Sequence, residues 1–264
     1  MRITVLGKSP AWQDAGGACS GYLVEEADTV LLLDCGNGVF GKLRERIDFR
    51  QIGAVVLSHL HADHFLDLIP FAYALTYHPC QQPVPVHIWP GTDTPAKPRL
   101  YAPRGAGEVF ERVTGAWGAN GLVGNAFDVQ EYDPTDLLEI GHLRVRFHPV
   151  PHFVPACAIE IASADDGARF TFGADSAPTE ELVRFARDTD LLMIEATLPR
   201  PERDGMRGHL TPAEAGEHGS KAKVKQLVLT HFPAELGIDW VREEAERAFG
   251  AKVSVAAEGD VYTV

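Results

Sequence analysis

Four side chains of the kinds that bind transition metals lie within six residues of one another. They are His59, His61, Asp63 and His64, in the pattern H-x-H-x-D-H. The apolar run 54–57 directly precedes them and predicts a buried strand, so the pattern falls on the loop after that strand. A loop that turns there can direct several of these side chains into one small volume. The pattern therefore predicts a metal site with imidazole and carboxylate ligands.

Further ligand-type residues recur at predicted strand ends later in the chain. His152, Asp175 and His231 each come within three residues of the end of such a strand. Two metal ions need more ligands than residues 59–64 supply, and these three positions provide them. Two ions close together can lower the pKa of a water toward about 7 and can hold substrate oxygens. We therefore expect a dinuclear hydrolase.

The elements that must position these residues fall into two strand-rich blocks, each with helices. We expect strands at 3–6, 22–25, 30–34, 54–57, 84–89, 143–150, 156–161, 169–172, 191–195, 226–229, 252–256 and 261–264. Helices are expected at 65–77, 107–117, 179–187, from Thr211-Pro212 onward and at 240–249. Residues 91–126 are rich in Gly, Pro and Ala, and we interpret them as a cover over the site. The pattern predicts an α/β fold, a four-layer αββα sandwich, in a single domain over residues 1–264.

In type and order, the seven ligand-type residues resemble the motifs of the metallo-β-lactamase superfamily. The resemblance spans nearly the whole chain. It implies two divalent metal ions, with zinc expected and manganese or iron as alternatives, and a bridging hydroxide as nucleophile. One ion would be held by His59, His61 and His152, the other by Asp63, His64 and His231, with Asp175 bridging them. Asp63 would also orient the hydroxide, and Asp34 resembles the early Asp of the family, which supports a liganding imidazole.

Two further groups of residues resemble paired loops of the ribonuclease Z-like branch. They are Ile194-Glu195-Ala196-Thr197 and Gly208-His209-Leu210-Thr211. The resemblance gives Glu195 the role of orienting His209. His209 would then stabilise the phosphate or donate a proton to the leaving alkoxide. Ile194 departs from the branch, in which His is common at this position. A structural alternative is that Glu195 forms a surface ion pair and that His209 caps the helix that follows.

The charge balance and one short hairpin restrict the classes of substrate that we expect. The chain has 24 Lys and Arg against 37 Asp and Glu, a formal net charge of -13, which disfavours a long polyanion. Residues 153–174 read as a plain hairpin without the basic arm with which ribonuclease Z grips transfer RNA. We therefore favour the arm-less relatives, which include cyclic-nucleotide phosphodiesterases, and expect a cyclic nucleotide or similar small phosphodiester as substrate. Phe153, Trp117 or Tyr77 could stack on a base, and Lys8 could contact a phosphate.

Three other functions stay open at this point. The same scaffold could hydrolyse a carbonyl ester, lactone or thioester, or could act as a ribonuclease Z-like nuclease. A metal-bound sensing protein without turnover is the third.

The cysteines and the apolar runs indicate the cellular compartment that we expect for the protein. The four cysteines are far apart with no C-x-x-C pair, the N-terminus reads as a strand rather than a secretion signal, and no apolar run approaches the roughly 20 residues of a membrane span. We expect a cytoplasmic protein with no membrane contact and no stable nucleic-acid complex, and leave a homodimer open.

Overall fold

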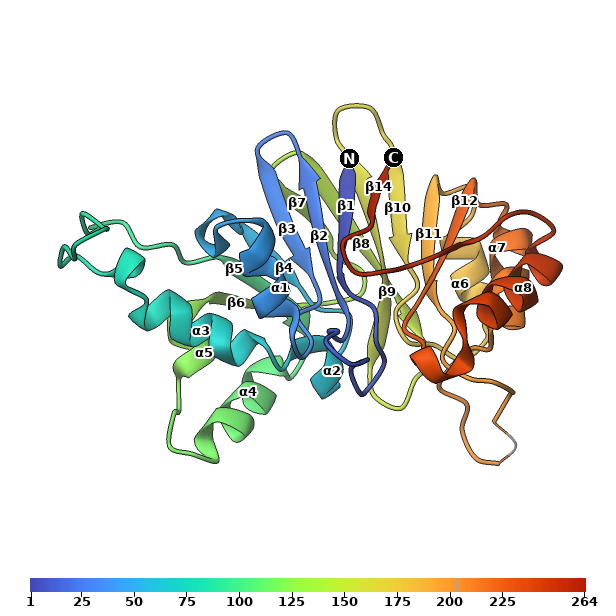
Figure 1. The fold of residues 1–264 in the computed structure, drawn as a ribbon, viewed down its shortest axis with the longest axis horizontal. Coiled ribbons are helices and arrows are strands. Elements are labelled where there is room, and N and C mark those ends of the chain that lie inside the picture. Colours follow the sequence, from blue (N-terminus) through green and yellow to red (C-terminus); the bar gives the residue numbers. More distant parts are fainter. Residues whose placement is uncertain (203) are drawn as a thin grey trace.

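The computed structural model, which describes residues 1–202 and 204–264, has two seven-stranded sheets packed face to face with helices outside them (Figure 1). The first sheet has the order β14-β1-β2-β3-β4-β5-β6. Its strands are β1 Arg2–Gly7, β2 Gly21–Glu26, β3 Thr29–Leu33, β4 Ala54–Val56, β5 Arg99–Pro103, β6 Asp128–Tyr132 and β14 Val261–Thr263. The helices of this half are α1 Val39–Arg46, α2 Ala62–Phe65, α3 Leu68–Tyr77, α4 Ala106–Gly115 and α5 Leu122–Ala126, with short 3-10 turns at η1 Phe49–Gln51 and η2 Pro79–Gln81.

The second sheet has the order β13-β12-β11-β10-β9-β8-β7. Its strands are β7 Leu137–Ile140, β8 Leu143–Val150, β9 Ala156–Ser163, β10 Arg169–Phe172, β11 Leu191–Glu195, β12 Gln226–Thr230 and β13 Ser254–Val255. Its outer face is covered by α6 Glu180–Phe185, α7 Pro212–Ala222 and α8 Ile238–Phe249, with η3 Ala234–Leu236 before α8 (Figure 1). Helices outside two facing sheets make the predicted four-layer αββα sandwich.

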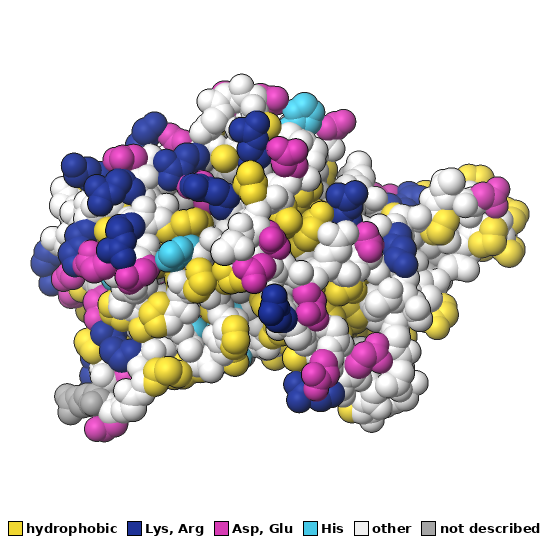
Figure 2. Space-filling view, turned by 180° about the vertical axis from the view of Figure 1, so that it is seen from behind, with side chains coloured by type: hydrophobic (Ala, Val, Ile, Leu, Met, Phe, Trp, Pro, Cys, Tyr) yellow, Lys and Arg dark blue, Asp and Glu magenta, His cyan; other side chains and the backbone are white. Residues whose placement is uncertain are grey.

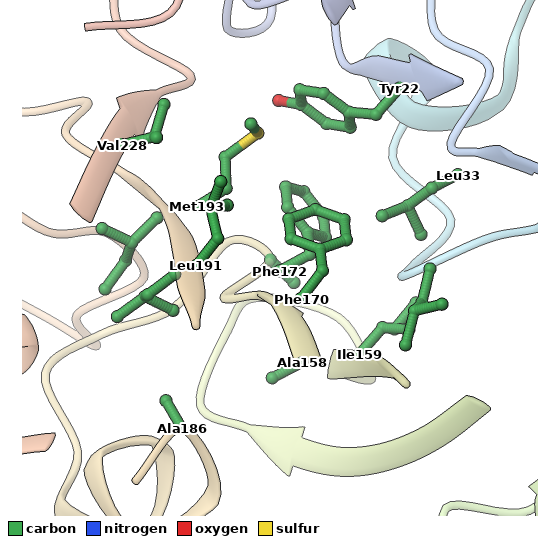
Figure 3. Close-up of a cluster of buried hydrophobic side chains, with 14 of the residues drawn as sticks. Tyr22, Leu33, Ala158, Ile159, Phe170, Phe172, Ala186, Leu191, Met193 and Val228 are labelled. Carbon is green, nitrogen blue, oxygen red and sulfur yellow. The ribbon is translucent and has the colours of Figure 1, made fainter. Parts of the chain in front are cut away.

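Alternation along the strands builds the core between the sheets. In β3, Leu31 and Leu33 pack toward the second sheet, while Leu32 packs with the helices of the first half. Across the interface, Tyr22 meets Phe172 with ring centroids 5.1 Å apart (Figure 3). These buried aromatic and branched side chains fix the two sheets to each other, and so fix the strand ends that carry the ligand-type residues.

The prediction of a strand at 84–89 is wrong. Only an isolated bridge joins Val86 to Trp89 there, and Val84 and Ile88 are exposed. The next strand of the first sheet is β5, which begins at Arg99, ten residues after the end of the predicted strand. Three prolines, at 83, 85 and 90, limit ladder hydrogen bonds in this stretch despite its apolar alternation.

Residues 91–126, which we interpreted as a cover, contain β5, α4 and α5. The glycines that suggested a loop have a different role, because Gly105 and Gly121 precede the first turns of α4 and α5 with φ of +87° and +74°. Glycine adopts this left-handed backbone without steric cost. The helix predicted at 107–117 is confirmed as α4, and the one predicted at 65–77 is confirmed as α3 from Leu68 onward, whereas Phe65 ends the preceding short helix α2.

None of the helices in the described part of the chain is long and apolar enough to cross a lipid bilayer.

Candidate metal centre

Strand direction places the carboxyl ends of four strands at one edge of the second sheet. β8 and β10 both pair antiparallel to β9, and β11 and β12 run parallel to β10, so these four strands share one direction. The first sheet reaches the same edge, because the amide of Cys157 at the start of β9 donates to the carbonyl of Ser58 just after β4 at 3.1 Å. Side chains that follow these strands can therefore meet.

They meet in two groups that share one carboxylate. His59, His61 and His152 form one group, and Asp63, His64, Asp175 and His231 form the other, each with ligand atoms within 4.8 Å of one another. Asp175 Oδ2 lies 3.5 Å from His64 Nε2 and 3.3 Å from His231 Nε2. It also lies 3.9 Å from Nε2 of both His59 and His152. The structure thus brings all seven predicted ligand residues together, with Asp175 between the two groups.

The donor atoms of this cluster fit metal ions. His59 Nε2, His64 Nε2 and Asp175 Oδ1 are buried and have no hydrogen-bond partner. A buried polar atom without a partner is costly, unless it binds something else. In the described part of the chain no Lys or Arg pairs with the buried carboxylates of Asp34, Asp63 and Asp175, so their charge also requires compensation. Two divalent cations would meet both needs.

Hydrogen bonds behind the cluster set which imidazole nitrogen faces it. The Ser58 hydroxyl donates to Asp34 Oδ2 at 2.7 Å and lies 3.1 Å from His59 Nδ1. His64 Nδ1 lies 2.8 Å from the same Asp34 oxygen. His152 Nδ1 lies 2.8 Å from the carbonyl oxygen of Gly208. Since each acceptor favours a proton on Nδ1, the Nε2 lone pairs of these three histidines point into the cluster.

Thr197 sets the orientation of the His231 imidazole, a role that was not predicted from the sequence. Its hydroxyl lies 2.9 Å from His231 Nδ1 and donates to the carboxylate of Glu195. The backbone of His231 has φ of +49°, in the left-handed region, as do Asp34 at +55° and Ala174 at +53°. Such residues cost free energy and occur at functional sites. The i, i+2 spacing of Glu195 and Thr197 at a strand end was the signal available in the sequence.

The environment of the cluster shifts the pKa of several members. Burial lowers the pKa of His152 to about 4. Burial opposes ionisation of Asp63, yet the hydrogen bond from His231 and the charge of His64 lower its pKa to about 2. Burial also lowers the pKa of His59 well below its usual value. His64 differs: burial opposes its protonation, but the charges of Asp175 and Asp34 raise its pKa well above the usual value. A neutral imidazole and an ionised carboxylate are the forms that bind metal, so an ion bound at His64 would replace the proton that these carboxylates favour.

Glu195 and His209 form a pair beside the cluster. His209 Nδ1 lies 3.1 Å from both carboxylate oxygens of Glu195, and the amide of Ser176 donates to Glu195 Oε1 at 2.8 Å. Burial disfavours protonation of His209, but the hydrogen bond and charge of Glu195 raise its pKa to about 9. Glu195 is buried rather than in a surface ion pair, and the cap of α7 is Thr211 with its own capping box, so the structural alternatives for both residues are excluded.

A cavity of about 540 Å³ opens onto these residues. Its lining combines five ligand-type or catalytic candidates with Thr197 and with apolar residues from three loops and the start of α2: Pro10, Ala11, Trp12, His61, Ala62, Asp63, Asp175, Thr197, Leu198, Pro199, His209, His231 and Pro233. Residues 91–126 do not line it, and neither does Tyr77. Phe153 is also outside the lining, but its ring is exposed and its centroid lies 5.8 Å from that of His209, so it stays a candidate for contact with a base. Trp117 instead donates to the Tyr73 hydroxyl at 3.1 Å. Lys8 also lies outside the lining and pairs with Asp14.

The fold and the cluster define a metal-dependent hydrolase of the αββα class. The protein-family model of the beta-lactamase superfamily domain matches residues 29–232, and the chain belongs to this family. It is 30% identical over 263 residues to the probable metallo-hydrolase YhfI of Bacillus subtilis, covering 99% of both chains. It is 28% identical over 303 residues to the ribonuclease Z of Halorubrum lacusprofundi, covering 100% of this chain and 97% of that one.

Solved structures agree on the fold. The crystal structure of the metallo-beta-lactamase fold protein YhfI from Bacillus subtilis matches with a TM-score of 0.83 at 27% identity and covers 99% of both chains. The crystal structure of unliganded yeast PDE1 matches with a TM-score of 0.73 at 12% identity and covers 98% of both chains, a likeness of fold alone.

Proposed function

We propose that this chain hydrolyses a small phosphodiester, with a cyclic nucleotide as the favoured substrate. The observation that carries the proposal is the Glu195–His209 pair beside the ligand cluster, at the end of a cavity of about 540 Å³. An imidazolium next to a metal-ligand cluster suits a reaction in which an oxygen anion forms and must be protonated. The similarity to a ribonuclease Z supports the same chemistry, because a ribonuclease cleaves phosphodiester bonds.

The cluster would hold two divalent ions. His59, His61 and His152 would bind one, and Asp63, His64 and His231 the other, with Asp175 shared between them. When bound, such ions lower the pKa of a water and offset charge on substrate oxygens. Zinc fits this mixture of imidazole and carboxylate ligands, as do manganese and iron.

The chain's own residues would perform the proton transfer. Glu195 engages His209 Nδ1, which leaves Nε2–H of the imidazolium for the substrate. From the cavity lining, this N–H would stabilise negative charge on the phosphate or donate its proton to the departing ribose oxygen. Asp63, whose pKa is lowered to about 2, stays ionised and can accept a hydrogen bond from the attacking water.

The surface argues for a small substrate. The segment between His152 and Asp175 holds the hairpin of β9 and β10, with no inserted arm. On the face in Figure 2, many Lys and Arg side chains gather on the left, but Asp and Glu side chains lie among them, so this part of the face is not uniformly basic. A polyanion such as transfer RNA requires many such contacts, whereas a mononucleotide requires only the cavity.

A substrate panel on metal-loaded protein tests the proposal. It contains 3′,5′-cyclic AMP, bis(p-nitrophenyl) phosphate, a precursor transfer RNA with a 3′ trailer, a thioester and a lactone. We expect turnover of the first two. Turnover of the carbonyl substrates alone would replace the proposal with a carbonyl hydrolase, and trimming of the RNA at a higher kcat/KM than cyclic AMP would replace it with a nuclease. A metal-loaded protein inert toward every substrate would favour a sensing role.

A further inference from the structure

The rim of the cavity beside the ligand cluster is apolar and comes from three separate loops. Residues 10–12 lie between β1 and β2, Leu198 and Pro199 follow β11, and Pro233 follows β12. The enclosed volume of about 540 Å³ is in the range of small-molecule sites, about 300–1,000 Å³. A substrate with its phosphate on the ligand cluster would meet this rim with the rest of its body.

Trp12 is the large aromatic side chain of the rim. It lines the cavity and is nevertheless 54% exposed, so much of the indole surface is free to contact a ligand. Exposed apolar surface next to a polar site is typical of ligand binding, because covering it with the ligand is favourable. Pro199 and Pro233 extend the same surface with rigid rings.

The loop that carries Trp12 is anchored on both sides. Lys8 pairs with Asp14 and donates to the carbonyl of Phe232 at 3.2 Å. The Asp14 carboxylate also accepts from the amide of Ala234 at 3.1 Å, and the Cys19 thiol donates to the carbonyl of Pro10 at 3.0 Å. The contacts of Lys8 and Asp14 tie the loop to the segment after His231, so the backbone that carries Trp12 is held beside the ligand cluster before a substrate binds.

We infer that Trp12 forms a binding site for the base of the substrate and selects nucleoside phosphodiesters over phosphodiesters of plain sugars or alcohols. The inference rests on the proposed function, since it assigns the part of the substrate beyond the phosphate. The ligand is a flat, uncharged heteroaromatic ring that stacks on the indole. Among the described residues that line the cavity there is no Lys or Arg, which favours an uncharged ring there over a second phosphate.

Kinetics on a matched pair of substrates tests the inference. One is 3′,5′-cyclic AMP and the other is the 3,5-cyclic phosphate of methyl riboside, which has the same sugar and phosphate but no base. In Trp12→Ala we expect the ratio of kcat/KM for the first over the second to fall by about fivefold to 150-fold, the range for loss of one base-stacking side chain. Trp12→Phe, which keeps a ring, should retain most of the ratio. Trp117→Ala is the control, because Trp117 is 50% exposed and lies outside the cavity lining.

A binding measurement separates this inference from the proposed function. Adenosine 5′-monophosphate is titrated into wild type and Trp12→Phe while tryptophan fluorescence is followed, with ribose 5-phosphate as the base-free probe. We expect the nucleotide alone to quench wild type, and the quenching to be lost in the variant. Absence of phosphodiester turnover would overturn the proposed function, and the titration would still decide the base site. Equal quenching in both proteins, or a ratio unchanged in Trp12→Ala, would overturn the inference about Trp12.

Discussion

The hydroxyl of Thr197 connects His231 to Glu195. It lies 2.9 Å from His231 Nδ1 and donates its proton to the Glu195 carboxylate, so it must accept the proton of the imidazole. His231 belongs to the ligand cluster, and Glu195 holds His209. One side chain therefore supports both the metal-ligand group and the proton-transfer pair.

Thr197→Val should weaken metal binding. The substitution keeps the shape but removes the acceptor that fixes the imidazole orientation of His231, and loss of such a partner lowers metal affinity by about 10–100-fold. Zinc competition with a chelator would measure this change, with Thr197→Ser as the control that keeps a hydroxyl. Wild-type affinity in Thr197→Val would show that the backbone alone orients His231.

His64→Ala should lose metal as well as activity. The residue is fully buried, with Nδ1 on Asp34 and Nε2 directed into the cluster, so its removal takes away a ligand and leaves the Asp34 carboxylate with Ser58 as its remaining partner. After dialysis, elemental analysis should give close to two ions per wild-type chain and fewer in the variant; Asp63→Ala should behave alike.

The control for these variants is His142→Ala, because His142 is a surface residue that pairs with Asp165. It should retain the full metal content. Full content in both His64→Ala and Asp63→Ala, with circular dichroism unchanged, would contradict the ligand assignment.

The sequence predicts the cluster well because its members are ionisable residues that follow buried strands, either directly or within the H-x-H-x-D-H run after β4. Such a signal needs no knowledge of packing. Thr197 offers only its i, i+2 spacing from Glu195 and Trp12 offers no signal of this kind, because neither side chain is ionisable and their roles depend on which loops meet at the edge of the sheet. The misplaced strand at 84–89 has the same origin: apolar alternation there satisfies the pattern, while the prolines and the partner strand decide the pairing.

His209→Ala should slow hydrolysis while leaving the metal content intact. His209 belongs to the Glu195 pair rather than to the seven expected ligands, and the loss of a general acid costs about a hundredfold or more in kcat. The loss should be large for cyclic AMP, whose alkoxide needs a proton, and smaller for bis(p-nitrophenyl) phosphate, whose phenolate leaves without one. Equal losses for both substrates would assign His209 to charge stabilisation alone, and unchanged turnover of both would remove it from the reaction.

Arg207→Ala should destabilise the loop that presents His209. Arg207 binds Glu214 through two hydrogen bonds of 2.8 and 3.0 Å and Glu202 through one of 3.1 Å, and Glu202 in turn accepts from the amide of Gly208 at 3.1 Å. Because both carboxylates are largely shielded from solvent, loss of these charged hydrogen bonds should lower the free energy of unfolding by about 1–3 kcal/mol and reduce kcat. Urea unfolding and steady-state kinetics would measure the two effects.

The matched control for Arg207 is Arg184→Ala, which breaks an exposed i, i+3 pair with Glu181 on α6. Exposed pairs of this kind contribute about 0–1 kcal/mol, so this variant should remain close to wild type in both measurements. If Arg207→Ala were as stable and as active as Arg184→Ala, residues 208–211 would hold His209 in place without the ion pairs of Arg207. In that case the capping box of Thr211 and the packing of Leu210 would be sufficient to position His209.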